Sequence, residues 1–352
     1  MILDRYLIRD ALGAWLAVAV VLLAIMLSTR FTFFLALSAK GDLPPDLLFK
    51  VVGLSSLRYM VLLVPVALLL GVMLSLGRLY KDNEIAALTG CGVGLSRFYR
   101  PYLFLGLAMA ALTAALSFEI SPWAARQADY LLKDAKRLVQ YTPFEAGRFK
   151  PVADGKAVFY TSSLSGDGTQ LGEVLAFIEE EGGTTLLTAK SGTQAIDGNT
   201  GERQISLSQG QRARVTPGEA RTEVADFARL STRITPPDFI FNSSSRAIMS
   251  TAALAASGDP KDRAELHWRI AAPLSALILV LLAVPLAHVG PRQGRYGKLV
   301  IGVLVYLAYS NVLSLGQAWM AKGTLPPALG LWWVHALFLG FAGWLVWRRR
   351  SV

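Results

Sequence analysis

Two carboxylates in a short polar stretch are the side chains in this sequence best placed to meet a charged partner. Asp82 and Glu84 follow a long apolar run, and Ile85 and Leu88 come soon after them. Glu84 would fall in the first turn of a helix, where a negative charge interacts favourably with the helix dipole. Ile85 and Leu88 would share one face at i, i+3 spacing. The stretch predicts a short helix near residues 81–90 with an apolar stripe and a protruding carboxylate.

The ends of this predicted helix have their own signals. Asp82 or Asn83 can occupy the N-cap position. Gly90, Gly92 and Gly94 follow the last apolar residue and end the helix. A helix of this kind can dock into a groove of a partner protein, which is one interpretation. The other is a turn between two membrane spans that lies on lipid headgroups.

Three cations next to apolar runs form a second candidate site. They are Arg30, Lys40 and Arg58. Guanidinium groups bind phosphate through two parallel hydrogen bonds, so this set could bind the phosphates of an anionic lipid. The alternative is that each side chain reaches up to the outer headgroups without a specific ligand.

Motifs for catalysis and nucleotide binding are missing from the sequence. A Walker A loop needs Gly-Lys followed by Ser or Thr, but the Gly-Lys pairs at residues 155–156 and 297–298 precede Ala157 and Leu299. There is no Gly-x-Ser-x-Gly run, the three histidines are far apart, and the one cysteine is Cys91. The sequence therefore predicts no catalytic residue, no metal site and no cofactor. Any ATP would be bound by a partner.

Long apolar runs must position these residues. The chain has 352 residues, of which 53% are hydrophobic and 17% charged, whereas a soluble domain carries about 25% charged residues. Six runs have the length of about 20 residues that a membrane span needs: Ala11–Thr29, Tyr59–Gly77, Pro101–Phe118, Ile270–His288, Leu299–Trp319 and Leu325–Trp347. The first is too long for the core of a signal peptide, so we expect it to be retained.

The basic residues in the short loops predict the orientation of these spans. One side carries twelve Lys and Arg and the other side five, so the positive-inside rule places both termini in the cytoplasm. Residues 121–262 hold 16 basic and 17 acidic residues, while the rest holds 19 and 8. Because the one large polar region is close to neutral, the excess basic charge indicates membrane orientation rather than nucleic-acid binding.

The polar region between the third and fourth runs predicts an all-β domain outside the cytoplasm. It opens with a helical segment, Ala124–Val139, and continues as short strand-like runs separated by Gly, Asp, Asn and Pro. The runs are Ala157–Ser162, Glu173–Glu179, Thr184–Lys190, Gln204–Ser208, Arg212–Val215 and Glu223–Ile234. This spacing indicates a sandwich, jellyroll or barrel. The interior would be either an ordinary packed core or an apolar trough.

The chain resembles the lipopolysaccharide-export permeases of the LptF/LptG type at several places in order. The similar runs are Arg5-Tyr6-Leu7, residues 77–85 with Gly90-Cys91-Gly92, residues 263–269, and residues 291–295. The last two are more similar to F-type than to G-type subunits. The resemblance covers the whole chain and implies six transmembrane helices in a 3+3 arrangement with an inserted periplasmic jellyroll. The expected divisions are 1–120, 121–262 and 263–352.

The resemblance also implies a function and partners. The chain would be a permease subunit of an ATP-driven exporter in the inner membrane that passes lipopolysaccharide to a periplasmic bridge. Its partners would be an LptG-like subunit, an LptB-type ATPase dimer, an LptC-like bitopic protein and an LptA-like bridge. Glu84, with Asp82, Ile85 and Leu88, would form the helix that meets the ATPase. By the same resemblance, Arg30 and Lys40 lie where contacts with lipid phosphates would be expected, and Arg58 completes this candidate site on the residues alone.

Two other functions compete with transport. A membrane-anchored periplasmic sensor or scaffold would be expected to have a cytoplasmic signalling domain, which the sequence does not show. A membrane-embedded enzyme would need clustered nucleophile, base or metal ligands, which are not found either.

Overall fold

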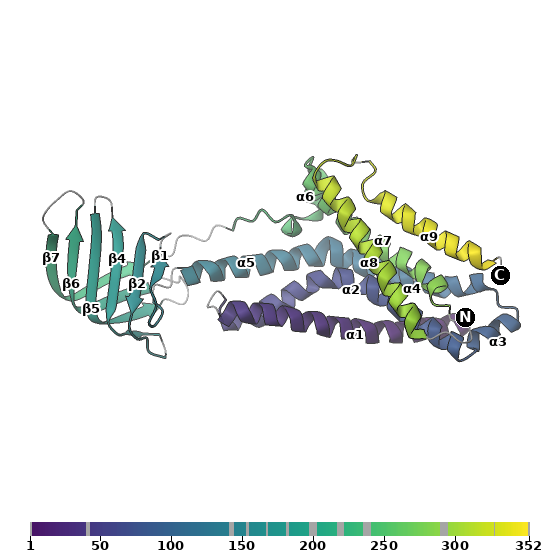
Figure 1. Cartoon of the computed structure of the whole chain (residues 1–352), viewed down its shortest axis with the longest axis horizontal. Coiled ribbons are helices and arrows are strands. Elements are labelled where there is room, and N and C mark those ends of the chain that lie inside the picture. The colour runs from purple at the N-terminus through teal and green to yellow at the C-terminus, as the bar shows by residue number, and fades with distance from the viewer. Residues whose placement is uncertain are drawn as a thin grey trace. The chain divides into compact units, whose positions relative to one another are not determined.

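The chain forms two compact units, one helical and one built on strands (Figure 1). The computed structural model describes residues 2–39, 43–140, 144–152, 155–166, 168–180, 183–196, 203–216, 222–234, 241–288, 295–326 and 328–350. The helical unit comprises Met1–Ala36, Asp46–Asp129 and Ser243–Val352, and the second unit comprises Leu37–Pro45 and Tyr130–Asn242. The larger segment of the second unit, Tyr130–Asn242, lies inside the expected division 121–262, whereas Leu37–Pro45 lies outside it.

The helices begin and end close to the apolar runs, but most extend past them. They are α1 (Ile2–Ala39), α2 (Pro45–Lys81), α3 (Glu84–Gly90), α4 (Leu95–Ala115), α5 (Ser121–Gln140), α6 (Thr251–Ala256), α7 (Pro260–Leu286), α8 (Arg295–Ala321) and α9 (Trp332–Arg350). A π-helical turn, Leu116–Ile120, joins α4 to α5, and a short 3-10 helix, Arg246–Ile248, precedes α6. The third predicted span and the helical segment at Ala124–Val139 are thus one continuous helix.

Five helices in the described part of the chain are long and apolar enough to cross a membrane. They include α1, α2, α7 and the continuous helix Arg97–Arg137, and the fifth lies within α8 at Gly297–Ala321. The sixth predicted run is shorter as a helix, since residues 329–331 form a turn and α9 starts only at Trp332.

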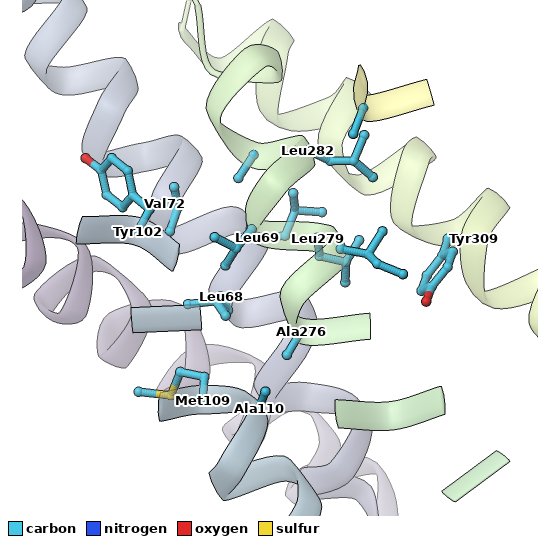
Figure 2. Packing of buried hydrophobic residues seen from close by; sticks show 14 of the residues in the cluster. Leu68, Leu69, Val72, Tyr102, Met109, Ala110, Ala276, Leu279, Leu282 and Tyr309 are labelled. Atoms are coloured by element: carbon cyan, nitrogen blue, oxygen red, sulfur yellow. The ribbon is translucent and has the colours of Figure 1, made fainter. Parts of the chain in front are cut away.

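The helical unit is organised around α2 and α7. In each of them 67% of the most apolar stretch is buried, against 6% in α1 and 22% in α8. Figure 2 shows Leu68, Leu69 and Val72 of α2 packed with Ala276, Leu279 and Leu282 of α7, and with Tyr102 and Met109 of α4. Because α1 and α8 bury little of their apolar surface, lipid or another protein must cover them.

The described residues of the second unit include one antiparallel sheet of seven strands. They are β1 (Lys150–Val152), β2 (Ala157–Thr161), β3 (Gln170–Leu171), β4 (Val174–Glu180), β5 (Gly183–Ile196), β6 (Arg203–Val215) and β7 (Thr222–Ile234). The order is β1-β2-β4-β5-β6-β7, and β3 pairs with β5. The small core of this unit consists of Phe144, Leu171, Val174, Ala189, Ile205 and Leu207.

Strand β6 corrects the prediction of two separate strands at Gln204–Ser208 and Arg212–Val215. The register runs through the intervening residues, because Ser208 pairs with Arg229 and Gly210 with Phe227. Only Gln209 leaves the extended conformation, with φ 53°. The two predicted runs stop on either side of Gly210, but in the strand this glycine allows the close approach of a neighbouring strand.

Candidate functional site

Helix α3 is present where the sequence predicts it, and its end is well defined. Cys91 is the C-cap, and Gly92 has φ 86°. The amide of Gly92 donates to the carbonyl of Thr89 at 2.9 Å, and the amide of Val93 donates to that of Leu88 at 3.0 Å. These two bonds form a Schellman motif, which requires a left-handed residue and so favours glycine.

The start of α3 differs from the usual capped helix. Asn83 holds the N-cap position that is predicted for Asp82 or Asn83, but it has φ 59° and its side chain makes no capping hydrogen bond. Asn tolerates this left-handed conformation better than most residues. The helix start is therefore set by the backbone and by the side chains around Glu84.

One face of α3 is anchored in the helical core and the opposite face is open. Ile85 is 3% exposed and belongs to the core, and Leu88 packs against that core half-buried. Ala86, Ala87 and Gly90 are exposed. Ile85 therefore holds α3 in place, while a face of small residues is presented outward. The sequence interpretation counts Ile85 and Leu88 in the partner contact and does not include the two alanines.

The carboxylate of Glu84 is bound by two side chains from other helices. The hydroxyl of Tyr6 in α1 donates to its Oε2 at 2.8 Å, and Arg78 of α2 donates to its Oε1 at 3.4 Å. The side chain remains 34% exposed. Glu84 is thus fixed in orientation by α1 and α2 while it stays reachable from solvent.

Arg78 is the centre of this polar cluster. Its guanidinium donates to Asp10 of α1 at 2.8 Å, to Tyr6 at 3.2 Å and to Asp82 at 3.5 Å, besides Glu84. Ser75 donates to the other oxygen of Asp10 at 2.5 Å. The i, i+4 spacing of Arg78 and Asp82 is a signal that the sequence does contain. Nothing in the local sequence indicates the partners on α1.

A second ion pair joins α1 to α4 near the same end of the unit. Arg97 donates to Asp4 at 3.1 Å. Arg78 and Arg97, two of the basic residues that flank the predicted helix, therefore have structural partners.

The predicted cation site is described only in part. The Arg30 guanidinium lies 4.2 Å from the centre of the Tyr59 ring, and Phe31 contacts Phe49 with ring centroids 5.9 Å apart. Arg58, the residue before Tyr59, is exposed. Lys40 lies outside the described residues. The structure thus places Arg30 of α1 next to the segment of α2 that carries Arg58.

The sheet carries a groove of about 900 Å³ that crosses the middle of its strands. Aromatic side chains line it, among them Phe149, Tyr160 and Phe227, and Phe149 stacks on Tyr160 with centroids 4.8 Å apart. Lys190 and Asp226 add charge. The sheet therefore combines a small packed core with an open, largely apolar groove. Features of both alternatives, a packed core and an apolar trough, are present in the described residues.

Two arginines that the sequence interpretation does not single out hold the chain where it returns to the helical unit. Arg126 donates twice to the carbonyl of Ile248, at 2.9 and 3.3 Å. Arg269, 3% exposed, donates to the carbonyls of Met249, Arg246 and Ala247 at 2.9, 3.2 and 3.2 Å. These bonds fix residues 246–249 against α5 and α7.

The fold is that of a helical membrane protein with an inserted antiparallel β unit, and a short anchored helix lies between its second and third long helices. A family model described as "Lipopolysaccharide export system permease LptF/LptG" matches residues 5–348. The chain belongs to this family.

The relatives are F-type members. The "Lipopolysaccharide export system permease protein LptF" of Escherichia coli K12 is 29% identical over 347 residues, which cover 97% of this chain and 93% of the relative. The proteins of the same name in Escherichia coli O157:H7 and Shigella flexneri match equally. Together with the five apolar helices, the membership indicates an inner-membrane protein.

Proposed function

We propose that this chain is a permease subunit of an ATP-binding-cassette exporter that extracts lipopolysaccharide from the inner membrane and passes it to a periplasmic bridge. The relatives carry lipopolysaccharide export in their names. ATP is bound and hydrolysed by a separate cytoplasmic ATPase that docks on α3. Glu84 and the exposed face of α3 meet the ATPase, while Ile85 and Leu88 hold the helix from behind and Asp82 supports Arg78.

The anchored helix α3 is the observation that supports this proposal most directly. Its inner face is fixed in the core by Ile85, and its outer face carries Ala86 and Ala87 beside the carboxylate of Glu84. Small residues allow close backbone approach, and an oriented carboxylate accepts strong hydrogen bonds from a partner's arginine. Such a surface suits docking in a groove better than contact with lipid headgroups.

Substitution of Glu84 tests the docking role. We expect Glu84→Arg to abolish co-purification with the cognate ATPase, because it reverses the charge at the contact. Glu84→Gln keeps the shape and one acceptor, and we expect it to weaken binding and retain part of it. If both variants bind the ATPase and release lipopolysaccharide as the wild-type chain does, the ATPase docks elsewhere.

For the cargo, we propose that the phosphates of lipopolysaccharide meet Arg30 and Arg58, with Lys40 following α1 in sequence. Acyl chains then enter the groove of the sheet, which belongs to a periplasmic jellyroll. The aromatic lining at Phe149, Tyr160 and Phe227 supports this route, since apolar clefts of several hundred Å³ are typical of ligand sites. A photo-crosslinker at Phe227 should capture lipopolysaccharide, and one at the exposed Val224 serves as the control.

The proposed partners fit surfaces that the chain leaves open. An LptG-like subunit would cover the apolar faces of α1 and α8, with α9 as the sixth span and both termini in the cytoplasm. Strand β7 pairs with β6 on one side in the described sheet, and its residues 222–233 are exposed or half-buried. A free edge of 13 residues can accept a strand of another sheet, as the LptC-like and LptA-like partners would supply.

A further inference from the structure

Helix α1 has little support along its middle. Four apolar side chains there are more than half exposed: Leu16 56%, Val20 56%, Val21 58% and Ile25 60%. Closer to its start, Leu7 and Ala11 are buried in the core. The end of α1 that carries Tyr6 is therefore held in this core, and near the other end Phe34 is buried as well.

The Tyr6 hydroxyl joins α1 to α3 directly. It donates to Glu84 at 2.8 Å and accepts from Arg78 at 3.2 Å, while Arg78 also binds Glu84. The three side chains close a ring of hydrogen bonds between α1, α2 and α3. Hydrogen bonds to charged groups are stronger than those between neutral groups. A displacement of Glu84 therefore acts on Tyr6 and, through it, on the first turns of α1.

Asp10 is a second residue of α1 that binds Arg78. It lies one turn beyond Tyr6 on the helix and binds Arg78 at 2.8 Å and Ser75 at 2.5 Å. Both α1 residues are thus engaged by α2, but only the Tyr6 bond reaches the carboxylate of α3. The removal of one oxygen atom from Tyr6 breaks the one direct bond between α1 and Glu84 in the described residues, and it leaves Arg78 bound to Asp10 and Glu84.

We propose that Tyr6 is a positioning residue that passes a movement of α3 to α1. The inference rests on the proposed function, in which an ATPase docks on α3. When the ATPase shifts α3, the Tyr6–Glu84 bond moves the inner end of α1 with it. Since the middle of α1 packs weakly on its own chain, this movement changes the exposed apolar face that α1 shows to lipid or to a second subunit.

The variant Tyr6→Phe separates the transmission of movement from α3 to α1 from the docking of the ATPase on α3. In the complete complex with the ATPase and the second permease subunit, we expect Tyr6→Phe to assemble and hydrolyse ATP as the wild type does. Lipopolysaccharide released per ATP should fall about tenfold, the size expected for one hydrogen bond to a charged group. Tyr306→Phe is the matched control, because the Tyr306 hydroxyl makes no hydrogen bond in the described part of the chain. Unchanged release in Tyr6→Phe, or loss of ATPase binding, would overturn the proposal.

A distance measurement decides the question without a transport assay. Cys91 is the one cysteine of the sequence, is exposed and caps α3, so a spin label there pairs with one at Leu16→Cys on α1. We expect a narrow distance distribution with Tyr6 and a broader one in Tyr6→Phe, in the purified full chain. Equal distributions would show that Tyr6 does not position α3. If the wild-type chain recruits no ATPase, the proposed function fails, whereas this comparison still judges Tyr6.

Discussion

Arg269 of α7 donates a hydrogen bond to the carbonyl oxygen of Met249 at 2.9 Å, and the same guanidinium also binds the hydroxyl of Thr251 at 3.1 Å. Thr251 in turn donates to the carbonyl of Phe118, in the π-helical turn, at 2.7 Å. A π turn leaves carbonyl groups without their usual helical partners. The arginine and the threonine therefore stabilise the place where the long helix changes its hydrogen-bond pattern.

Truncation of Arg269 should be strongly destabilising. Its side chain is 4% exposed and pairs with Glu265 at 3.2 Å, so Arg269→Ala leaves a largely buried carboxylate and several carbonyls without a donor. We expect a loss of about 3–5 kcal/mol in the free energy of unfolding, measured by thermal or denaturant unfolding in detergent. Arg269→Lys keeps the charge but has fewer donors, so it should fall between wild type and Arg269→Ala. A stability equal to wild type for Arg269→Ala would refute the role of these bonds.

Gly210 should tolerate no side chain. A Cβ there would collide with the carbonyl oxygen of Thr188 and with the ring of Phe227. Overpacking of this kind costs about 1–3 kcal/mol, so Gly210→Ala should lower the unfolding midpoint of the sheet, followed by circular dichroism. Gly166→Ala is the matched control, because no atom lies within 4 Å of the position that its added methyl group would take. Equal midpoints for the two variants would contradict the close packing at Gly210.

The contacts of the Asp259 carboxylate predict that the protein loses stability in acid. Asp259 caps α7 and accepts from the Lys261 amide at 2.9 Å. This backbone bond, and then Arg246 at 3.2 Å, hold the pKa of Asp259 below its ordinary value of 3.8. A lowered pKa means that the contribution is complete above pH 3.8 and is lost as the pH falls through the lowered pKa. Arg246 stays charged throughout, since Asp259 and Asp262 raise its pKa in spite of desolvation.

An asparagine at position 259 separates the effect of the capping hydrogen bond from the effect of the negative charge. Asp259→Asn keeps the capping oxygen, so it should flatten the dependence of the unfolding midpoint on pH below 3.8. Asp259→Ala should lower the midpoint at every pH. If the unfolding midpoint of Asp259→Asn falls in acid as steeply as that of the wild type, a group other than Asp259 causes the loss of stability.

Arg30 should distinguish lipid-phosphate binding from simple contact with headgroups. If it binds lipopolysaccharide phosphate, Arg30→Ala should retain about tenfold less lipopolysaccharide after purification, because a hydrogen bond to a charged group is lost. Arg30→Lys keeps the charge without the planar fork and should lie between the two. Phe49→Leu, which removes a neighbouring ring and no charge, is the control. Equal retention in all variants would favour the headgroup interpretation.

The apolar runs predict most of the helical unit because a span is a matter of length and composition, which the sequence displays directly. The sixth run is the exception. The sequence indicates one run over Leu325–Trp347, but α9 begins at Trp332. The turn before it contains Gly330, which has φ 47° and lies against the ring of His267. Hydropathy does not reveal a turn whose residues are apolar.

The position of α3 could be predicted, but its contacts could not. The three glycines mark its end, and the Schellman motif at Gly92 confirms that prediction. The hydrogen bond from Tyr6 to Glu84 joins residues 78 positions apart, and such a contact depends on how α1 packs against α2. In the same way, the lengths of β5 and β6 follow from their pairing with each other along 12 residue pairs. The sequence pattern instead ends the first run at Lys190 and divides the second between Ser208 and Arg212.

The outward face of α3 carries no side chain longer than a methyl group at Ala86, Ala87 and Gly90. In the proposed complex, the partner must therefore supply the large side chains that pack against Ala86, Ala87 and Gly90, and Glu84 beside them supplies the charge. Changes of partner preference would then be easier to obtain by mutation of the ATPase groove than by mutation of this helix. Any enlargement at Ala86 or Ala87 would act as a spacer that pushes every partner away.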